Sequence, residues 1–191
     1  MVGLAALTLS WGLGATAAIA AEINERLQPS LEPLDLVAIK TGQVPSQVQT
    51  NTSISAVGLT LPSLWWTETQ FIVQSPSSEQ LLDQWLAYPI VNNQPGRIDI
   101  VVNRQLWSMM AYLERYEFLN ELGETARSYG YNLRVFERRG EPLAAYTCDL
   151  RAIPLPPSPS ERGQLRARTD IPCQVQLDLT HRDSVTNSLS F

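Results

Sequence analysis

The sequence predicts an α+β fold, with a small antiparallel-rich sheet and helices packed on one face, in a single domain. Three observations predict this fold. Residues 97–103, RIDIVVN, form an apolar run that is typical of a buried strand. Residues 104–129 are rich in strong helix formers, and Gly130 follows as the C-terminal cap. The runs YNLRVFE and PLAAYTCDL flank the turn RRGEP and predict a hairpin, with Gly140 supplying the turn conformation.

The composition limits the number of domains and the class of partner. The chain has 191 residues, of which 44% are hydrophobic and 17% are charged. This balance suits one globular domain with extensions and a core of its own. The net charge is −5 at pH 7. Because nucleic-acid binding needs a basic field, we predict no nucleic-acid partner.

The first 21 residues predict export. They carry no charged side chain, and their apolar stretch ends in Ala18-Ile19-Ala20, a small-x-small pattern that a signal peptidase cleaves. The segment is also long enough to remain in a bilayer, so residues 1–21 are predicted to be a signal peptide or a membrane anchor. The basic region of an ordinary signal is missing, which indicates an upstream start or an atypical signal. A buried helix of the domain is the remaining alternative.

The next segment, residues 22–51, is interpreted as a flexible tether. Three prolines interrupt every helical pattern in it, and the stretch SQVQTNTS is polar. The globular domain is therefore assigned to residues 52–179. Its predicted first elements are a short strand over SISAVGLTL and a helix that opens at Pro62 and Ser63.

A second helix is predicted over residues 77–88. Ser77 or Ser78 caps it, and Pro89 ends it. The apolar side chains that would share one face of this helix are Leu81, Leu82, Trp85 and Leu86.

The long helical segment, 104–129, has two apolar sides that lie nearly opposite each other at 100° per residue. The first side comprises Leu106, Met109, Met110, Leu113 and Tyr116, and the second comprises Leu119, Leu122, Ala126 and Tyr129. Either the helix breaks near Glu117, or its two halves pack against different layers. We favour a bend or break near Glu117, because one exposed stripe of five large side chains would be costly.

The C-terminal part contains the only two cysteines. Residues 154–163 are a proline-rich loop, and CQVQLDL alternates apolar and polar residues as an antiparallel strand does. Pairing of that strand beside residues 143–149 would bring Cys148 near Cys173 and allow a disulfide. The alternative is two reduced, buried thiols. Residues 180–191 are predicted to be a loose tail.

Most catalytic arrangements are absent. The only histidine, His181, lies in the tail, and the chain offers no plausible zinc-ligand set, so neither a metal nor a cofactor is predicted. Four acidic residues share one helical face: Glu114, Glu117, Glu121 and Glu124. The favoured interpretation is a solvated face. The functional alternatives are a cation site and a carboxylate-dependent hydrolase that uses Glu117 and Glu121.

Two sets of residues are candidates for binding. Asn103 and Arg104 follow a buried strand, where ligands often bind, although a helix cap at Asn103 is the simpler interpretation. Trp65 and Trp66 are adjacent, so they cannot both fill one core pocket of a helix. One of them is a candidate for a contact surface with a protein, or for stacking on a glycan or another small ligand.

Several stretches, among them GLTLPSLWW, LLDQWLAYP, IDIVVNRQLWSMMAYLERYEFLNELGETARSYGYNLRVF and LAAYTC, resemble an uncharacterised family of exported cyanobacterial proteins. The resemblance covers about residues 58–148 and implies a setting in the periplasm or thylakoid lumen, without implying an activity. With the absence of catalytic sets, it leads us to expect an exported, non-enzymatic accessory, assembly or protein-interaction factor. Its expected partner is another protein or a membrane complex, and residues 1–21 offer a membrane attachment.

Overall fold

The computed structural model describes residue 22 and residues 24–52, 81–92, 94–151 and 171–179. A six-stranded sheet follows the order of the chain, β1-β2-β3-β4-β5-β6. Its strands are β1 (Gln49–Thr50), β2 (Leu82–Tyr88), β3 (Gly96–Val102), β4 (Tyr131–Glu137), β5 (Pro142–Cys148) and β6 (Cys173–Leu177). Every neighbouring pair is antiparallel except β3 and β4, which are parallel. The α+β class and the antiparallel-rich sheet are thus confirmed.

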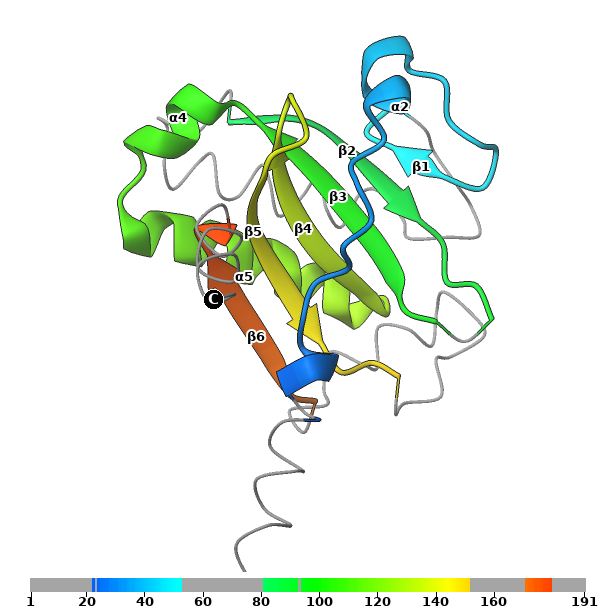
Figure 1. Cartoon of the computed structure of the whole chain (residues 1–191), viewed down its shortest axis with the longest axis vertical. Coiled ribbons are helices and arrows are strands. Elements are labelled where there is room, and N and C mark those ends of the chain that lie inside the picture. Colours follow the sequence, from blue (N-terminus) through cyan, green and yellow to red (C-terminus); the bar gives the residue numbers. More distant parts are fainter. Residues whose placement is uncertain (1–21, 23, 53–80, 93, 152–170, 180–191) are drawn as a thin grey trace, which may run out of the picture.

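The parallel pair is joined by α4 (Arg104–Met109) and α5 (Tyr112–Ser128). Figure 1 shows α5 lying across one face of the sheet. Apolar side chains from alternate positions of the strands meet Phe118, Leu119 and Leu122 of α5 in the main core. The helix approaches the sheet closely at Gly123, where an added Cβ would lie 2.2 Å from Cγ of Tyr146. A larger residue at that point would force the helix away from β5.

The opposite face of the sheet is covered by the N-terminal segment, which Figure 1 shows running in front of the strands. Leu34 packs on Val101 and Phe136. In α2 (Leu36–Thr41), Ala38 packs with Val48 on Leu86. Asp35 caps α2, since its carboxylate accepts hydrogen bonds from the backbone N–H groups of residues 37 and 38.

The prediction that residues 22–51 form a flexible tether is therefore wrong for its described residues. Leu34, Ala38 and Val48 are at most 5% exposed, and β1 adds a short antiparallel strand to the edge of β2. The prolines do exclude long helices, but they do not prevent an extended chain from burying isolated apolar side chains. The domain accordingly begins well before residue 52.

The helix predicted over residues 77–88 is also wrong over residues 82–88, which form strand β2. Both faces of this strand are covered. Trp85 and Ala87 enter the core beneath α5, whereas Leu86 packs with Ala38 of α2 on the other face. A strand that is buried on both sides loses the alternation of apolar and polar residues that identifies strands in a sequence. The strand over SISAVGLTL and the helix opening at Pro62 and Ser63 lie outside the described residues.

The long helical segment does break, but earlier than expected. Helix α4 ends at Met109, and α5 begins at Tyr112. The break falls within the first apolar side of the segment, between Met110 and Leu113, and part of that side is exposed. Residues 106 and 110 pack against the core, whereas Met109, Leu113 and Tyr116 remain in solvent.

The predicted hairpin and the final strand are confirmed. Strands β4 and β5 pair antiparallel around the turn at Gly140, which has a φ of 90°. Strand β6 pairs with β5 and places Cys148 opposite Cys173, and these two cysteines form a disulfide. The proline-rich loop at 154–163 and the tail at 180–191 lie outside the described residues. Within the described ranges, no helix is both long and apolar enough to cross a membrane.

Candidate functional site

Two regions of the structure are candidates for a functional site: a buried charged cluster beside a cavity, and an exposed apolar surface. The first is a buried charged pair in the middle of the sheet, on the face away from α5. The parallel register places Asp99 of β3 directly beside Arg134 of β4. Nε and Nη2 of Arg134 donate hydrogen bonds to the two carboxylate oxygens of Asp99 at 2.8 and 2.9 Å. Asp99 is 0% exposed and Arg134 is 4% exposed, so this bidentate pair is removed from water.

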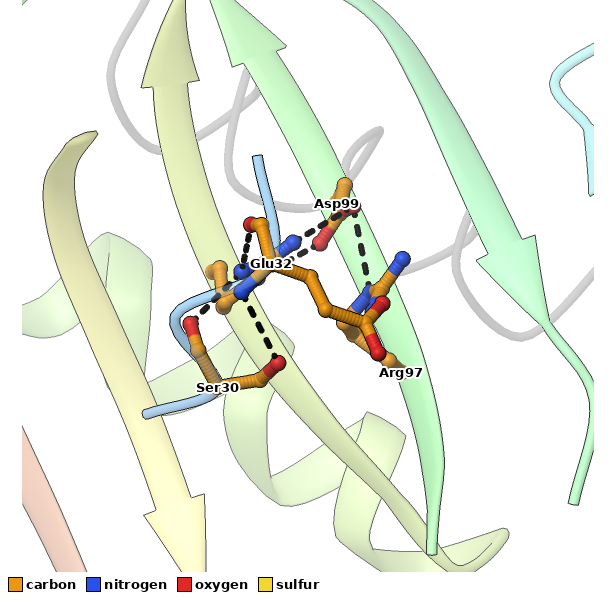
Figure 2. Close-up of polar contacts among 5 residues, drawn as sticks. Ser30, Glu32, Arg97 and Asp99 are labelled. Atoms are coloured by element: carbon orange, nitrogen blue, oxygen red, sulfur yellow. Dashed lines mark hydrogen bonds and ion pairs between the residues drawn. The ribbon is translucent and has the colours of Figure 1, made fainter. Parts of the chain in front are cut away.

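The same arginine holds the N-terminal strap, which we define as residues 27–34. Nη1 of Arg134 donates to the backbone carbonyl oxygens of Ser30 and Glu32, both at 2.6 Å (Figure 2). One guanidinium therefore joins two strands of the sheet to a segment more than 100 positions away in the chain. The strap is fixed at this point by hydrogen bonds to its backbone, and beyond it by the apolar contacts of Leu34.

Arg97 extends the charged cluster toward the start of β3. Its Nε lies 3.3 Å from the Oδ2 of Asp99, and its Nη1 pairs with the carboxylate of Glu32 (Figure 2). The guanidinium also stacks 4.2 Å above the ring of Tyr88. Desolvation by burial is the main cause that lowers the pKa of Arg97. Burial, together with the negative charge of Asp99, raises the pKa of Tyr88 to about 12.

A cavity of about 480 Å³ lies beside this cluster. Its lining comes from the strap, the start of β3, the middle of β4 and the end of β5. A second cavity, of about 410 Å³, lies between the strap and the β4–β5 hairpin. The strap thus crosses the sheet between the two cavities, and the hydrogen bonds from Arg134 hold it there.

The second region is the apolar corner, which we define as Met109, Tyr112, Leu113 and Tyr116. These four side chains are 74%, 62%, 69% and 41% exposed, respectively. They come from the end of α4 and the first turns of α5. Large apolar side chains that gather on one exposed surface are typical of an interaction site.

Contacts beneath the apolar corner hold it in one shape. Trp107 and Phe118 are buried and meet edge to face, with ring centroids 6.0 Å apart. Arg115 donates from Nε to the carbonyl oxygen of Trp107 at 3.0 Å, and from Nη2 to that of Ser108 at 3.3 Å. Because Arg115 occupies carbonyl groups at the C-terminal end of α4, the two helices are tied together across the break.

Asn103 and Arg104 have structural contacts. The Oδ1 of Asn103 accepts hydrogen bonds from the backbone N–H groups of residues 105 and 106 at 3.0 and 3.3 Å, so Asn103 caps α4. Arg104 forms ion pairs with Glu137, at 3.4 Å, and with Glu141. Two interpretations of Asn103 followed from the sequence: a helix cap or a ligand-binding residue. The contacts of Asn103 are those of a helix cap.

The acidic face of α5 divides into two kinds of residue. Glu114 accepts the backbone N–H of Ala111 at 2.7 Å, and Glu124 accepts the Oη–H of Tyr146 at 2.5 Å. Burial and this hydrogen bond raise the pKa of Tyr146. Glu114 and Glu124 therefore support the helix, whereas Glu117 is exposed and Glu121 is half-buried. Among the residues that the structure describes, no group of three or more His, Cys, Asp or Glu side chains could hold a metal ion.

Trp65 and Trp66 lie outside the described residues. Sequence reasoning missed the charged cluster and the strap, because the pairing of Asp99 with Arg134 depends on the register of two strands. One signal was available: each residue is a charge in the middle of an otherwise apolar strand. Comparison with protein-family models, curated proteins and solved structures finds no match for this chain.

Proposed function

We propose that this protein is an exported, non-enzymatic interaction factor that binds another protein through the apolar corner. The observation that carries this proposal is the exposure of four large apolar side chains on a support of buried rings and hydrogen bonds. Because the helices beneath these side chains are already fixed, binding at this surface needs no ordering of the backbone, which lowers the entropic cost of association. Tyr and Met are also enriched at the centres of protein interfaces.

The charge of the surroundings favours a protein partner over a lipid surface. Glu117 is exposed beside the apolar corner, and the whole chain has a net charge of −5. Anionic membrane surfaces attract basic segments, so this surface is poorly suited to them. We therefore expect a partner with an apolar contact surface that is bordered by basic side chains.

The disulfide supports the exported setting of this function. Disulfides form and persist in oxidising compartments and are rare in the cytosol of mesophiles. Together with the apolar residues 1–21, the bond between Cys148 and Cys173 favours the periplasm or the thylakoid lumen. We propose an accessory or assembly role on a complex in that compartment.

The test compares two substitutions of equal chemistry. Leu113→Glu places a charge in the apolar corner, and Val37→Glu places the same charge on α2. Both side chains are 69% exposed in the folded protein, so each variant should fold. C-terminally tagged wild type and both variants are expressed in the source organism, and gently solubilised extracts are separated by size. The proteins that co-elute are identified, and their affinities are then measured with purified components.

We expect wild type and Val37→Glu to migrate in the same defined complex. We expect Leu113→Glu to migrate as the free protein at an equal expression level, with at least about a tenfold loss of affinity for the purified partner. Migration of the wild type as a free monomer would count against a stable partner. Binding to lipid vesicles alone, lost in Leu113→Glu, would replace the protein partner by a membrane.

A further inference from the structure

We propose that the cavity between the strap and the first residues of β3 binds a small organic acid, through a carboxylate or a phosphate group. The cavity brings Arg97, Arg134 and Arg151 together with the buried hydroxyl of Thr147. This inference is independent of the apolar corner, which comes from other elements and uses other residues.

The cavity has the dimensions of a small-molecule site. Its volume of about 480 Å³ lies within the range of roughly 300–1,000 Å³ that is typical of ligand pockets. Arg97, Arg134 and Thr147 line it from strands β3, β4 and β5, so the sheet sets the positions of these three residues, whereas Arg151 follows the end of β5. The strap forms its outer wall, and Arg134 fixes that wall by hydrogen bonds to two backbone carbonyls.

Arginines outnumber carboxylates among the residues that line the cavity. Its lining includes four arginines and two glutamates: Arg26, Arg97, Arg134, Arg151, Glu25 and Glu32. Three of these arginines are compensated by carboxylates. Arg134 pairs with Asp99, Arg97 pairs with Asp99 and Glu32, and Arg26 pairs with Glu22 and Asp149.

Arg151 is the lining arginine whose charge is not compensated. It is exposed, and it forms no ion pair with the residues that the structure describes. Its guanidinium can therefore turn toward a ligand without breaking an existing contact. A planar guanidinium matches the geometry of a carboxylate or phosphate and can donate two hydrogen bonds to it.

Thr147 provides a second, independent indication of a ligand. It is 3% exposed and lines the cavity near the end of β5, on the same face of the sheet as Arg134. Within the described part of the chain, its Oγ1 has no hydrogen-bond partner. Buried polar atoms almost always have such a partner, and rotation about χ1 of Thr147 would bring this buried hydroxyl to a ligand oxygen in the cavity.

The surrounding contacts explain how such a site could be ready before the ligand arrives. Arg134 and Arg97 are already held by Asp99, so their positive charges stay in place without rearrangement. The ligand oxygens would accept hydrogen bonds from Arg151 and from the Thr147 hydroxyl. Pro29 and Pro95 offer apolar contact to the body of the ligand.

The experiment uses three ligands of similar shape and different charge: phenyl phosphate, benzoate and neutral benzamide. Binding to the full chain, with its disulfide formed, is measured by titration calorimetry at constant ionic strength. The variants are Arg151→Ala and Thr147→Val, and Arg139→Ala serves as the control. Arg139 is an exposed arginine in the β4–β5 turn, so this control changes the net charge equally and leaves the cavity lining intact.

We expect saturable binding of phenyl phosphate, benzoate or both, and the stronger of the two identifies the head group. Arg151→Ala should weaken this binding about tenfold and Thr147→Val about fivefold, whereas Arg139→Ala should bind as the wild type does. The proposal is overturned if neither anion binds up to about 10 mM, which is weaker than any specific site of this kind. Equal binding of benzamide, or equal losses in Arg151→Ala and Arg139→Ala, would also overturn it.

Discussion

Asp99 and Arg134 are ionised side chains buried in the centre of the sheet, where a charge is stable only beside its partner. Their bidentate contact meets this requirement, and the strap carbonyls use the remaining donor nitrogen of Arg134. All four of these hydrogen bonds are donated by Arg134. A change at Asp99 should therefore affect both the strength of the sheet and the attachment of the strap.

We predict that Asp99→Leu lowers the free energy of unfolding by about 3–5 kcal/mol, because Arg134 is left buried without a carboxylate. The double substitution Asp99→Leu with Arg134→Met should cost less than this single change, since no unpaired charge remains. Urea unfolding of the wild type and of both variants measures these differences. Arg134→Met alone loses the same strap hydrogen bonds as the double variant, so a double-mutant cycle over the three variants isolates the charge effect. A coupling energy of zero in that cycle would show that the charge of Arg134 does not need Asp99.

Tyr88 predicts how stability depends on alkaline pH. Its pKa is about 12 in the folded protein, against an ordinary value of 10.0, chiefly because its phenol is partly buried. Below pH 10 the phenol is neutral in both states. Between pH 10 and 12 the unfolded chain releases this proton while the folded chain keeps it, so the stability contributed by Tyr88 is lost across that window.

We therefore expect the free energy of unfolding to fall above pH 10, and to fall less steeply in Tyr88→Phe. Urea midpoints of the two proteins, measured in steps from about pH 8 to pH 11, give the two slopes. Identical slopes would mean that the phenol of Tyr88 ionises equally easily in the folded and unfolded chains.

At the scale of elements, the strands with a clear apolar pattern and clear turn residues could be predicted from the sequence. Strand β2, which is covered on both faces, could not. The strand over 97–103, the hairpin and the strand that begins at Cys173 follow directly from their apolar patterns and turn residues. Strand β2 and the residue before it have apolar side chains at 81, 82, 85 and 86, which fit a helical face equally well. Its true identity depends on α2 covering its second face, and this is information that the local sequence does not contain.

The disulfide acts on the edge of the sheet, where it joins β6 to β5. Cys148 and Cys173 are 25 positions apart, and closing such a loop stabilises the fold by about 3–4 kcal/mol in the chain-entropy model. We predict that replacing both cysteines by alanine lowers the free energy of unfolding by about 2–4 kcal/mol. Urea unfolding with and without a reductant measures this change.

The double alanine variant supplies the control for this prediction. Reductant should destabilise the wild type by the same amount and leave the variant unchanged, because the variant has no bond to break. A wild type whose unfolding is unaffected by complete reduction would show that the pairing of β5 with β6 is sufficient without the disulfide.

At the scale of the whole molecule, the boundary of the domain was the largest error of the sequence-based prediction. Apart from the short run at residues 36–39, the apolar residues of the N-terminal segment are separated from one another by polar or proline residues. No periodic pattern results, so the segment looks like a tether. The candidate site was hidden for a related reason, because its cavity wall and its buried pair come from segments distant in the chain.

The N-terminal segment should therefore be required for stability. We predict that deleting residues 1–52 lowers the free energy of unfolding by at least about 3 kcal/mol, because it removes the buried side chains of Leu34 and Val48. It also exposes the surfaces of Leu86, Val101 and Phe136 that these residues cover. Deletion of residues 1–21 alone leaves all of these contacts in place and should leave the urea midpoint unchanged.

Limited proteolysis extends the same argument to the intact chain, in case the shorter form does not fold. Trypsin should cleave after Lys40 only slowly, because Lys40 lies in α2 and its neighbour Ala38 is 3% exposed against the sheet. Disruption of the strap by Arg134→Met should accelerate cleavage after Arg26 more than cleavage after Lys40, since Arg134 binds Ser30 and Glu32 while α2 keeps its own apolar contacts. Rapid cleavage at Lys40 in the wild type, with a midpoint unaffected by the deletion of residues 1–52, would restore the tether interpretation.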